Sequence, residues 1–147
     1  MIDLLDELEA VLPRVGPIDQ AREIVAVMAR ISRAASVARF VERAGTLQWL
    51  AGDTLPTETA TTIRSAWQAQ RLRLLSGTAF TEAPAPVRRP MSAWLLWIRR
   101  PGDAGLDAVY LAGANLRPLS SCGAPLLRLG ALLVRIQEPA APSVAAP

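Results

Sequence analysis

Cys122 is the one side chain of this sequence that is a strong nucleophile by type. It stands in the segment Ser-Ser-Cys-Gly-Ala-Pro, just before a segment that suits a helix N-terminus, where the helix dipole lowers the pKa of a thiol. The chain contains no histidine, so a carboxylate or a water molecule would have to accept the thiol proton. We therefore predict no catalytic residue and no enzymatic activity, and keep a Cys122-dependent activity only as the minor alternative.

The sequence also lacks the ligands of the common metal and cofactor sites. A tetrahedral zinc site draws on several cysteine and histidine side chains, and Cys122 is the only residue of either type. The carboxylates of Asp3, Asp6, Glu7 and Glu9 are clustered, but they fit an amphipathic helix and not a calcium-binding loop. Glycine-rich phosphate-binding motifs are missing as well. We predict no metal and no cofactor.

Arginine supplies all 16 positive charges, because the sequence contains no lysine, and the formal net charge is +3. Arginine binds both the phosphates of nucleic acids and the carboxylates of proteins. A helix-turn-helix can be placed on Glu23 to Arg43, with Ser32 and Arg33 opening its recognition helix, but its turn would contain no glycine. Nucleic-acid binding is therefore the alternative hypothesis, and binding to another protein is the first one.

The segment Pro17 to Gly45 has the hydrophobic period of one long amphipathic helix, with arginines on its polar side. Pro17 suits a first helical turn, and Gly45 suits a helix end. The pattern is disturbed where Val37 and Phe40 turn to the arginine side and Glu42 turns to the apolar side. We interpret this disturbance as a bend, an early helix end or a second contact surface. The apolar side consists of Ile24, Val27, Ile31, Ala34, Ala38 and Val41.

Two further helical patterns flank this segment. Residues Met1 to Pro13 have the pattern of a short acidic helix. Residues Thr57 to Gly77 have the pattern of a third amphipathic helix, with Ile63 and Trp67 on its inner side. Together these segments predict an α-helical region over residues 1–80, organised like a three-helix bundle.

The pattern changes after a proline-rich connector at residues 81–90. The segments 91–99 and 106–112 have strand length and are bounded by proline and glycine, so they predict an antiparallel hairpin with a long loop. Both sides of the first strand are apolar, and we therefore expect both sides to be covered. One side consists of Trp94, Leu96 and Ile98, and the other of Ala93, Leu95 and Trp97.

The C-terminal part is predicted to contain one more helix. Leu126, Leu129, Leu133 and Ile136 form a helical stripe, although a strand pair divided at Gly130 is an alternative. We expect residues 91–138 to form a strand-containing region and the uncharged residues 139–147 to form a flexible tail. The predicted fold class is α+β, with a helical N-terminal half followed by a small antiparallel half.

The predicted function follows from the residue types that remain. Arginine and tryptophan dominate the energetics of protein interfaces, and hydrophobic residues make up 51% of the chain. We predict a cytoplasmic, non-enzymatic interaction module: an adaptor, or a small subunit of a larger assembly, that binds another protein or itself. No uncharged run approaches the roughly 18 residues of a membrane span, and core packing explains Trp67 better than a membrane-surface role does. The predicted partner-binding residues are Arg30, Arg33, Val37, Arg39, Phe40 and Arg43.

Overall fold

The computed structural model describes residues 6, 8–10, 12–73, 78–82, 92–100 and 105–136. Within these residues, five strands form one antiparallel sheet in the order β2-β1-β5-β4-β3. The strands are β1 (Ser36–Arg43), β2 (Thr46–Gly52), β3 (Thr78–Glu82), β4 (Ser92–Arg99) and β5 (Leu106–Gly113). The helical elements are the 3₁₀ turn η1 (Leu12–Arg14) and the helices α2 (Pro17–Ser32), α3 (Thr57–Arg73) and α4 (Leu119–Arg135).

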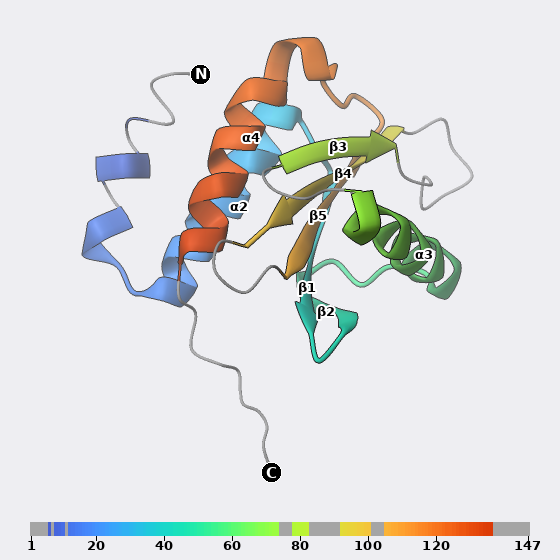
Figure 1. Ribbon diagram of the computed structural model, residues 1–147. Coiled ribbons are helices and arrows are strands. Elements are labelled where there is room, and N and C mark those ends of the chain that lie inside the picture. Colours follow the sequence, from blue (N-terminus) through green and yellow to red (C-terminus); the bar gives the residue numbers. More distant parts are fainter. Residues whose placement is uncertain are drawn as a thin grey trace.

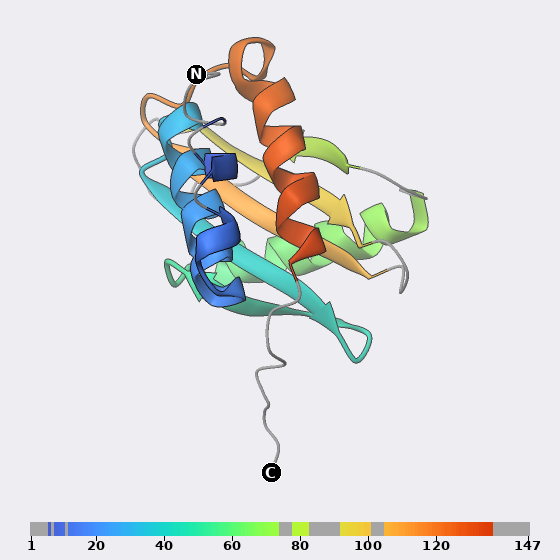
Figure 2. The ribbon, with the colours of Figure 1, turned by 90° about the vertical axis from the view of Figure 1, so that its left-hand side faces the viewer.

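The helices cover the two faces of the sheet unequally. Figures 1 and 2 show α2 and α4 side by side on one face, whereas α3 lies alone on the opposite face. Helix α4 contacts β3 and β4, and α2 contacts α4 and β1. The sheet is therefore the middle layer between a helix pair and a single helix.

Strands β4 and β5 are covered on both faces, which confirms the prediction made from the two apolar sides of β4. All positions of β5 are buried. Glycine at position 130 lets α4 approach β4 closely, because a Cβ there would lie 3.0 Å from atoms of Leu96 and Ile98. The side chains toward α2 and α4 are Leu96, Ile98, Val109 and Leu111. Those toward α3 are Ala93, Leu95, Trp97, Ala108, Tyr110 and Ala112.

The predicted three-helix bundle is wrong, and so is the description of the chain as helical. The long helix expected over Pro17 to Gly45 ends at Ser32, and the next residues form the hairpin of β1 and β2. β1 then pairs with β5, so the sheet takes strands from both sides of the 81–90 connector. The fold remains α+β, but the sheet and not a helix bundle organises it.

The disturbance noted at Val37, Phe40 and Glu42 marks the change from a helical period to a strand period. In a strand, successive side chains point to opposite faces. Val37 packs toward the α2 and α4 core, and Phe40 is buried in the α3 core. The helix itself ends because Arg33 adopts a left-handed conformation with φ of 60°, and its N–H reaches the carbonyl of Arg30 at 3.3 Å. Glycine usually occupies such a position, so the sequence carried no stop signal there.

The other predicted elements agree better with the structure. The third helix is α3, and the strands predicted at 91–99 and 106–112 are β4 and β5, paired antiparallel. The helix predicted at 126–136 is α4, which begins earlier, at Leu119, and the strand-pair alternative is wrong. In the connector, residues 81 and 82 belong to β3, while the rest of it and the tail 139–147 lie outside the described residues.

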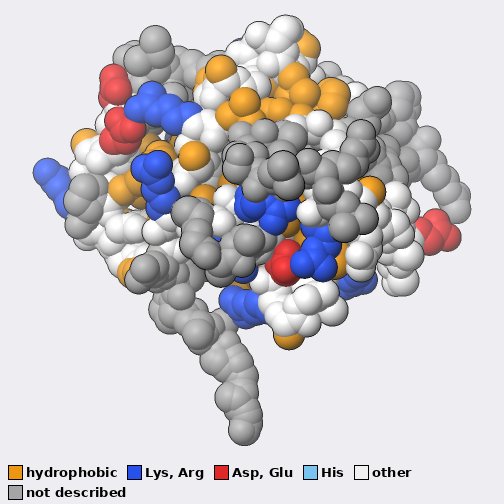
Figure 3. All heavy atoms as spheres, viewed as in Figure 1, with side chains coloured by type: hydrophobic (Ala, Val, Ile, Leu, Met, Phe, Trp, Pro, Cys, Tyr) orange, Lys and Arg blue, Asp and Glu red, His pale blue; other side chains and the backbone are white. Residues whose placement is uncertain are grey.

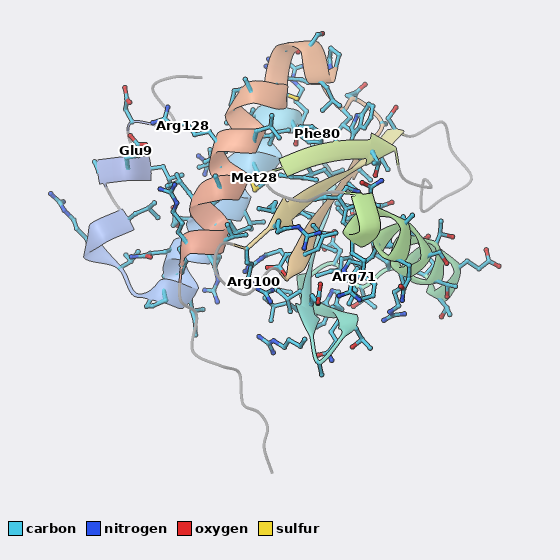
Figure 4. The ribbon with its side chains drawn as sticks, in the orientation of Figure 1. Glu9, Met28, Arg71, Phe80, Arg100 and Arg128 are labelled. Carbon is cyan, nitrogen blue, oxygen red and sulfur yellow. The ribbon has the colours of Figure 1, made fainter. Side chains whose placement is uncertain are left out.

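The described part of the N-terminal segment packs onto the helix pair. Leu8 is buried in the core that α2 and α4 share with the sheet. Glu9 forms an ion pair with Arg128 of α4, and both side chains are exposed; Figure 4 shows the two pointing toward each other. The amide of Gln20 holds the turn before α2 by donating to the carbonyls of Leu12 and Val15 at 2.8 and 3.0 Å.

The left-handed conformation of Arg33 gives a stability prediction. Replacing Arg33 by glycine should raise the free energy of unfolding by about 0.5 to 1 kcal/mol, because glycine adopts positive φ without a Cβ penalty. Urea denaturation measures the change. Arg33→Ala is the control, since it removes the same charge but keeps the Cβ, and it should give no such gain. Equal stabilities of the two variants would contradict the assigned conformation.

Candidate functional site

The candidate site begins with the tight turn between β1 and β2. Ala44 and Gly45 both have positive φ, 53° and 77°, which is the geometry of a two-residue type I′ turn. Such a turn closes on a hydrogen-bonded pair, here Arg43 and Thr46. Because hydrogen-bonded and non-hydrogen-bonded pairs alternate along an antiparallel ladder, the next pair, Glu42 and Leu47, is not hydrogen-bonded.

The surroundings of Glu42 confirm this assignment. Its N–H donates to Asp107 Oδ1 at 3.0 Å, and its carbonyl accepts from Arg100 Nη2 at 3.2 Å. Arg100 Nη1 in turn donates to Asp107 Oδ1. The regular pairing of β1 with β5 ends at Phe40, so these two side chains continue it by bonding the Glu42 backbone. The backbone N–H and C=O groups of Glu42 thus point toward β5. Those of Leu47 must point the opposite way within the plane of the sheet, away from β1 and toward the outer edge of β2.

The carboxylate of Glu42 binds the opposite side of the same junction. It accepts from the N–H of Leu106 at 2.9 Å and from Arg71 Nη2 at 3.4 Å. The Arg71 guanidinium also lies 4.8 Å from the ring centre of Trp67, whose indole N–H donates to the carbonyl of Leu106 at 3.1 Å. Arg71 and Arg100 approach this end of the sheet from α3 and from the end of β4 (Figure 4). Every carboxylate here is held by arginine and by backbone N–H groups, so the network stabilises the sheet.

A groove lies beside this network, between β2 and α3. It has a volume of about 260 Å³. We call it the β2–α3 groove; it is lined by Thr46, Leu47, Thr61, Arg64, Ser65, Trp67 and Gln68. The α3 residues 61, 64, 65 and 68 form one helical stripe, so a continuous polar wall faces β2. Arg64 is the only charged residue among the described residues that line the groove, and its Nε donates to the outward carbonyl of Leu47 at 3.2 Å.

Trp49 is an exposed aromatic residue of β2, the strand that also supplies Leu47 to the groove. It lies two residues from Leu47 and therefore on the same sheet face. Its side chain is 48% exposed, and its indole N–H donates to the carbonyl of Asp53 at 3.1 Å. A large, exposed aromatic side chain is a typical contact residue of protein interfaces.

The structure separates the partner-binding residues predicted from sequence. Arg30 and Arg33 are exposed at the end of α2, whereas Arg43 is exposed beside the hairpin turn. Val37 and Arg39 lie half-buried on the sheet face toward α2 and α4. Phe40 is only 2% exposed, within the core under α3. These six residues do not form one continuous surface.

Sequence reasoning missed Arg64 and Trp49, neither of which is among the partner-binding residues predicted from the sequence. The available signal was the pair Ala44-Gly45 between two segments with alternating apolar residues, which is a hairpin pattern. A predicted hairpin would have placed Trp49 on a strand. The contact of Arg64 with Leu47 had no signal, because it depends on the packing of α3.

Cys122 has the environment of a structural cysteine. Its side chain is buried, and its thiol donates to the carbonyls of Pro118 and Arg117 at 3.5 and 3.7 Å. Burial raises the pKa of the Cys122 thiol above its ordinary value of 9.0, although the nearby Arg117 guanidinium acts in the opposite direction. The thiol therefore carries less of the reactive thiolate at neutral pH than an exposed cysteine would.

Two absences can be stated for the part of the chain that the structure describes. No three histidine, cysteine, aspartate or glutamate side chains gather there as a set of metal ligands. The described helices also include none whose length and apolar character would let it cross a bilayer.

Removal of the Asp107 carboxylate tests the junction around Glu42. Asp107→Ala should lower the free energy of unfolding by about 2 kcal/mol, because it leaves the half-buried Glu42 N–H and the Arg100 guanidinium without this acceptor. Asp107→Asn keeps an acceptor oxygen and should cost about half as much. Urea denaturation of both variants measures the difference. A stability of Asp107→Ala equal to that of the wild type would contradict the role of this carboxylate.

Tyr110 allows a test of core burial by pH. It is the only tyrosine of the chain, and burial raises its pKa from 10.0 to about 12. The stability due to its neutral form is complete below pH 10.0 and is lost as the pH rises toward 12, a change of about 3 kcal/mol. The ultraviolet absorbance of tyrosinate should therefore titrate near pH 12 in the folded protein and near 10 in urea. A folded-state midpoint near 10, or an unchanged alkaline stability loss in Tyr110→Phe, would contradict this burial.

Comparisons of this chain with protein-family models, with curated protein sequences and with solved structures found no match. The features of this chain that could bind a partner are the β2–α3 groove and the exposed Trp49 on the same edge strand.

Proposed function

We propose that this chain is a non-enzymatic interaction module, an adaptor or a small subunit of an assembly, and that it binds another protein at the β2–α3 groove and Trp49. The observation that carries the proposal is the half-exposed Trp49 on the edge strand β2, which also supplies Leu47 to the β2–α3 groove. Exposed aromatic anchors next to a concave surface are the usual centres of binding energy in protein interfaces. A cytoplasmic location is part of the proposal.

This location differs from the arginine surface expected from sequence. Phe40 and Val37 contribute to the two cores, and Arg30 and Arg33 lie at the far end of α2 from the β1–β2 turn. The groove instead combines apolar contact area from Leu47 and Trp67 with one guanidinium and several hydroxyl groups. Such a mixture suits a peptide or protein surface better than a small apolar ligand.

The nucleic-acid alternative has less support. The residues that would have formed a recognition helix after Ser32 form strand β1. Figure 3 shows the arginine side chains of one face in separate groups, several of them beside acidic side chains, and not in one continuous band. Nucleic-acid binding relies on clustered basic residues that follow the phosphate backbone.

Substitution of Trp49 tests the proposal. The tagged full chain and its Trp49→Ser variant would be used to isolate partners from the native cells, with identification by mass spectrometry and affinity measurement on the purified pair. We expect Trp49→Ser to weaken a specific partner at least about tenfold, the loss typical of an aromatic hot spot.

Ile18→Ser is the matched control, because Ile18 is also a large exposed apolar residue, at 56%, but lies at the start of α2. It should leave the partner bound, and circular dichroism should show both variants folded. Equal binding by the two variants, or release of the same partner by both, would contradict the proposed surface.

A further inference from the structure

We infer that β2 binds an extended, acidic segment of the partner as an additional strand of the sheet, and that Arg64 exchanges its bond to Leu47 for a carboxylate of that segment. The inference rests on the proposed function, and it specifies the partner chemistry and the binding mode. It follows from three features: the direction of the β2 backbone, the composition of the groove and the position of Arg64.

The first feature is an edge whose backbone groups point outward at a regular spacing. β2 is the last strand in the sheet order, and no other described strand pairs with its outer side. Leu47 stands opposite Glu42 and Trp49 opposite Phe40, and both are non-hydrogen-bonded positions of the β1–β2 ladder. Their N–H and C=O groups thus face outward two residues apart, which is the pattern that an added strand pairs with.

The second feature is the chemistry of the surface next to this edge. An added strand would place every second side chain toward α3, over Leu47, Trp49 and the groove. The described residues that line the groove include the hydroxyls of Thr46, Thr61 and Ser65 but no carboxylate. The charge that these described residues contribute, Arg64, therefore selects an acidic side chain at the position beside Leu47. The Trp49 indole offers an apolar surface to the side chain of the added strand that lies two residues from this acidic residue.

The third feature is that Arg64 blocks the edge in the isolated chain. Exposed edge strands invite uncontrolled pairing, and proteins protect them with charged side chains. Here Arg64 Nε donates a hydrogen bond to the outward carbonyl of Leu47 at 3.2 Å, the group to which an added strand would donate. An incoming acidic strand supplies an N–H to that carbonyl and a carboxylate to the guanidinium, so both groups keep a partner. A basic or neutral strand would leave Arg64 without its acceptor, and this difference provides specificity.

The experiment selects ligands from a phage library of random dodecapeptides on the full chain and measures the affinities of the synthetic peptides obtained. We expect the selected peptides to share an acidic residue with an apolar residue two positions away. Arg64→Glu should weaken them at least about tenfold by reversing the charge. Arg22→Glu, which makes the same charge change on exposed α2 surface, should leave their affinity unchanged.

Backbone N-methylation separates strand addition from other binding modes. Methylation at alternate positions of a selected peptide should abolish binding, while methylation at the positions between should be tolerated, because only every second N–H of an added strand faces β2. Selection of no peptide, of peptides without an acidic residue, or of peptides whose methylation pattern lacks a period of two would overturn the inference. A labelled DNA or RNA oligonucleotide that displaces the peptides would overturn it as well.

The inference and the proposed function fail in different ways. If Trp49→Ser releases a cellular partner but the selected peptides lack the acidic or alternating pattern, the proposed function stands and strand addition is refuted. If the peptides behave as expected but no cellular partner depends on Trp49, the edge binds strands and the proposed function is refuted.

Discussion

The backbone N–H and C=O groups of Glu42 form hydrogen bonds with the side chains of Asp107 and Arg100. These hydrogen bonds determine which backbone groups of the β1–β2 hairpin point toward β5 and which point to the outer edge. They continue the pairing of β1 with β5 beyond the last regular pair, at Phe40. Because the Glu42 groups point inward to β5, those of Leu47 on the neighbouring strand point outward. The same junction joins α3 to the sheet, since the Glu42 carboxylate binds Arg71. The contacts of Glu42 thus stabilise the pairing within the sheet and also set the outward direction of the β2 backbone groups that we propose for binding.

The fold depends on covering a sheet that is apolar on both faces. β5 is buried at every position, so neither the helix pair nor α3 alone would suffice. α3 has a second role, because the stripe of residues that does not enter the core forms a wall of the β2–α3 groove. A helix that must pack on the sheet therefore also positions Arg64 at the sheet edge.

The strands β4 and β5 could be predicted from sequence because they are apolar runs of strand length bounded by proline or glycine, and the helix α4 could be predicted from its apolar stripe at helical spacing. β1 could not, because the helical stripe of α2 happens to continue through Ala34, Ala38 and Val41, and the helix ends at an arginine in a left-handed conformation. Because β1 was assigned to a helix, the predicted fold lacked the β1–β2 hairpin and contained a helix bundle where the structure has a sheet. The candidate site could not be predicted either, since β2 becomes an edge strand only when β1 pairs with both β2 and β5. Two signs of this error are visible in the sequence: the conflict at Val37 and Phe40, and the pair Ala44-Gly45 between two segments with alternating apolar residues.

The most direct test of the account is amide hydrogen exchange of β2 in the isolated chain, resolved by residue with NMR. The account predicts slow exchange for the Gln48 N–H, which faces β1 in a hydrogen-bonded pair with Val41, and fast exchange for Leu47 and Trp49, which face outward. Protection of Leu47 and Trp49 as strong as that of Gln48 would contradict the assigned direction of β2, and with it the proposed strand-binding edge.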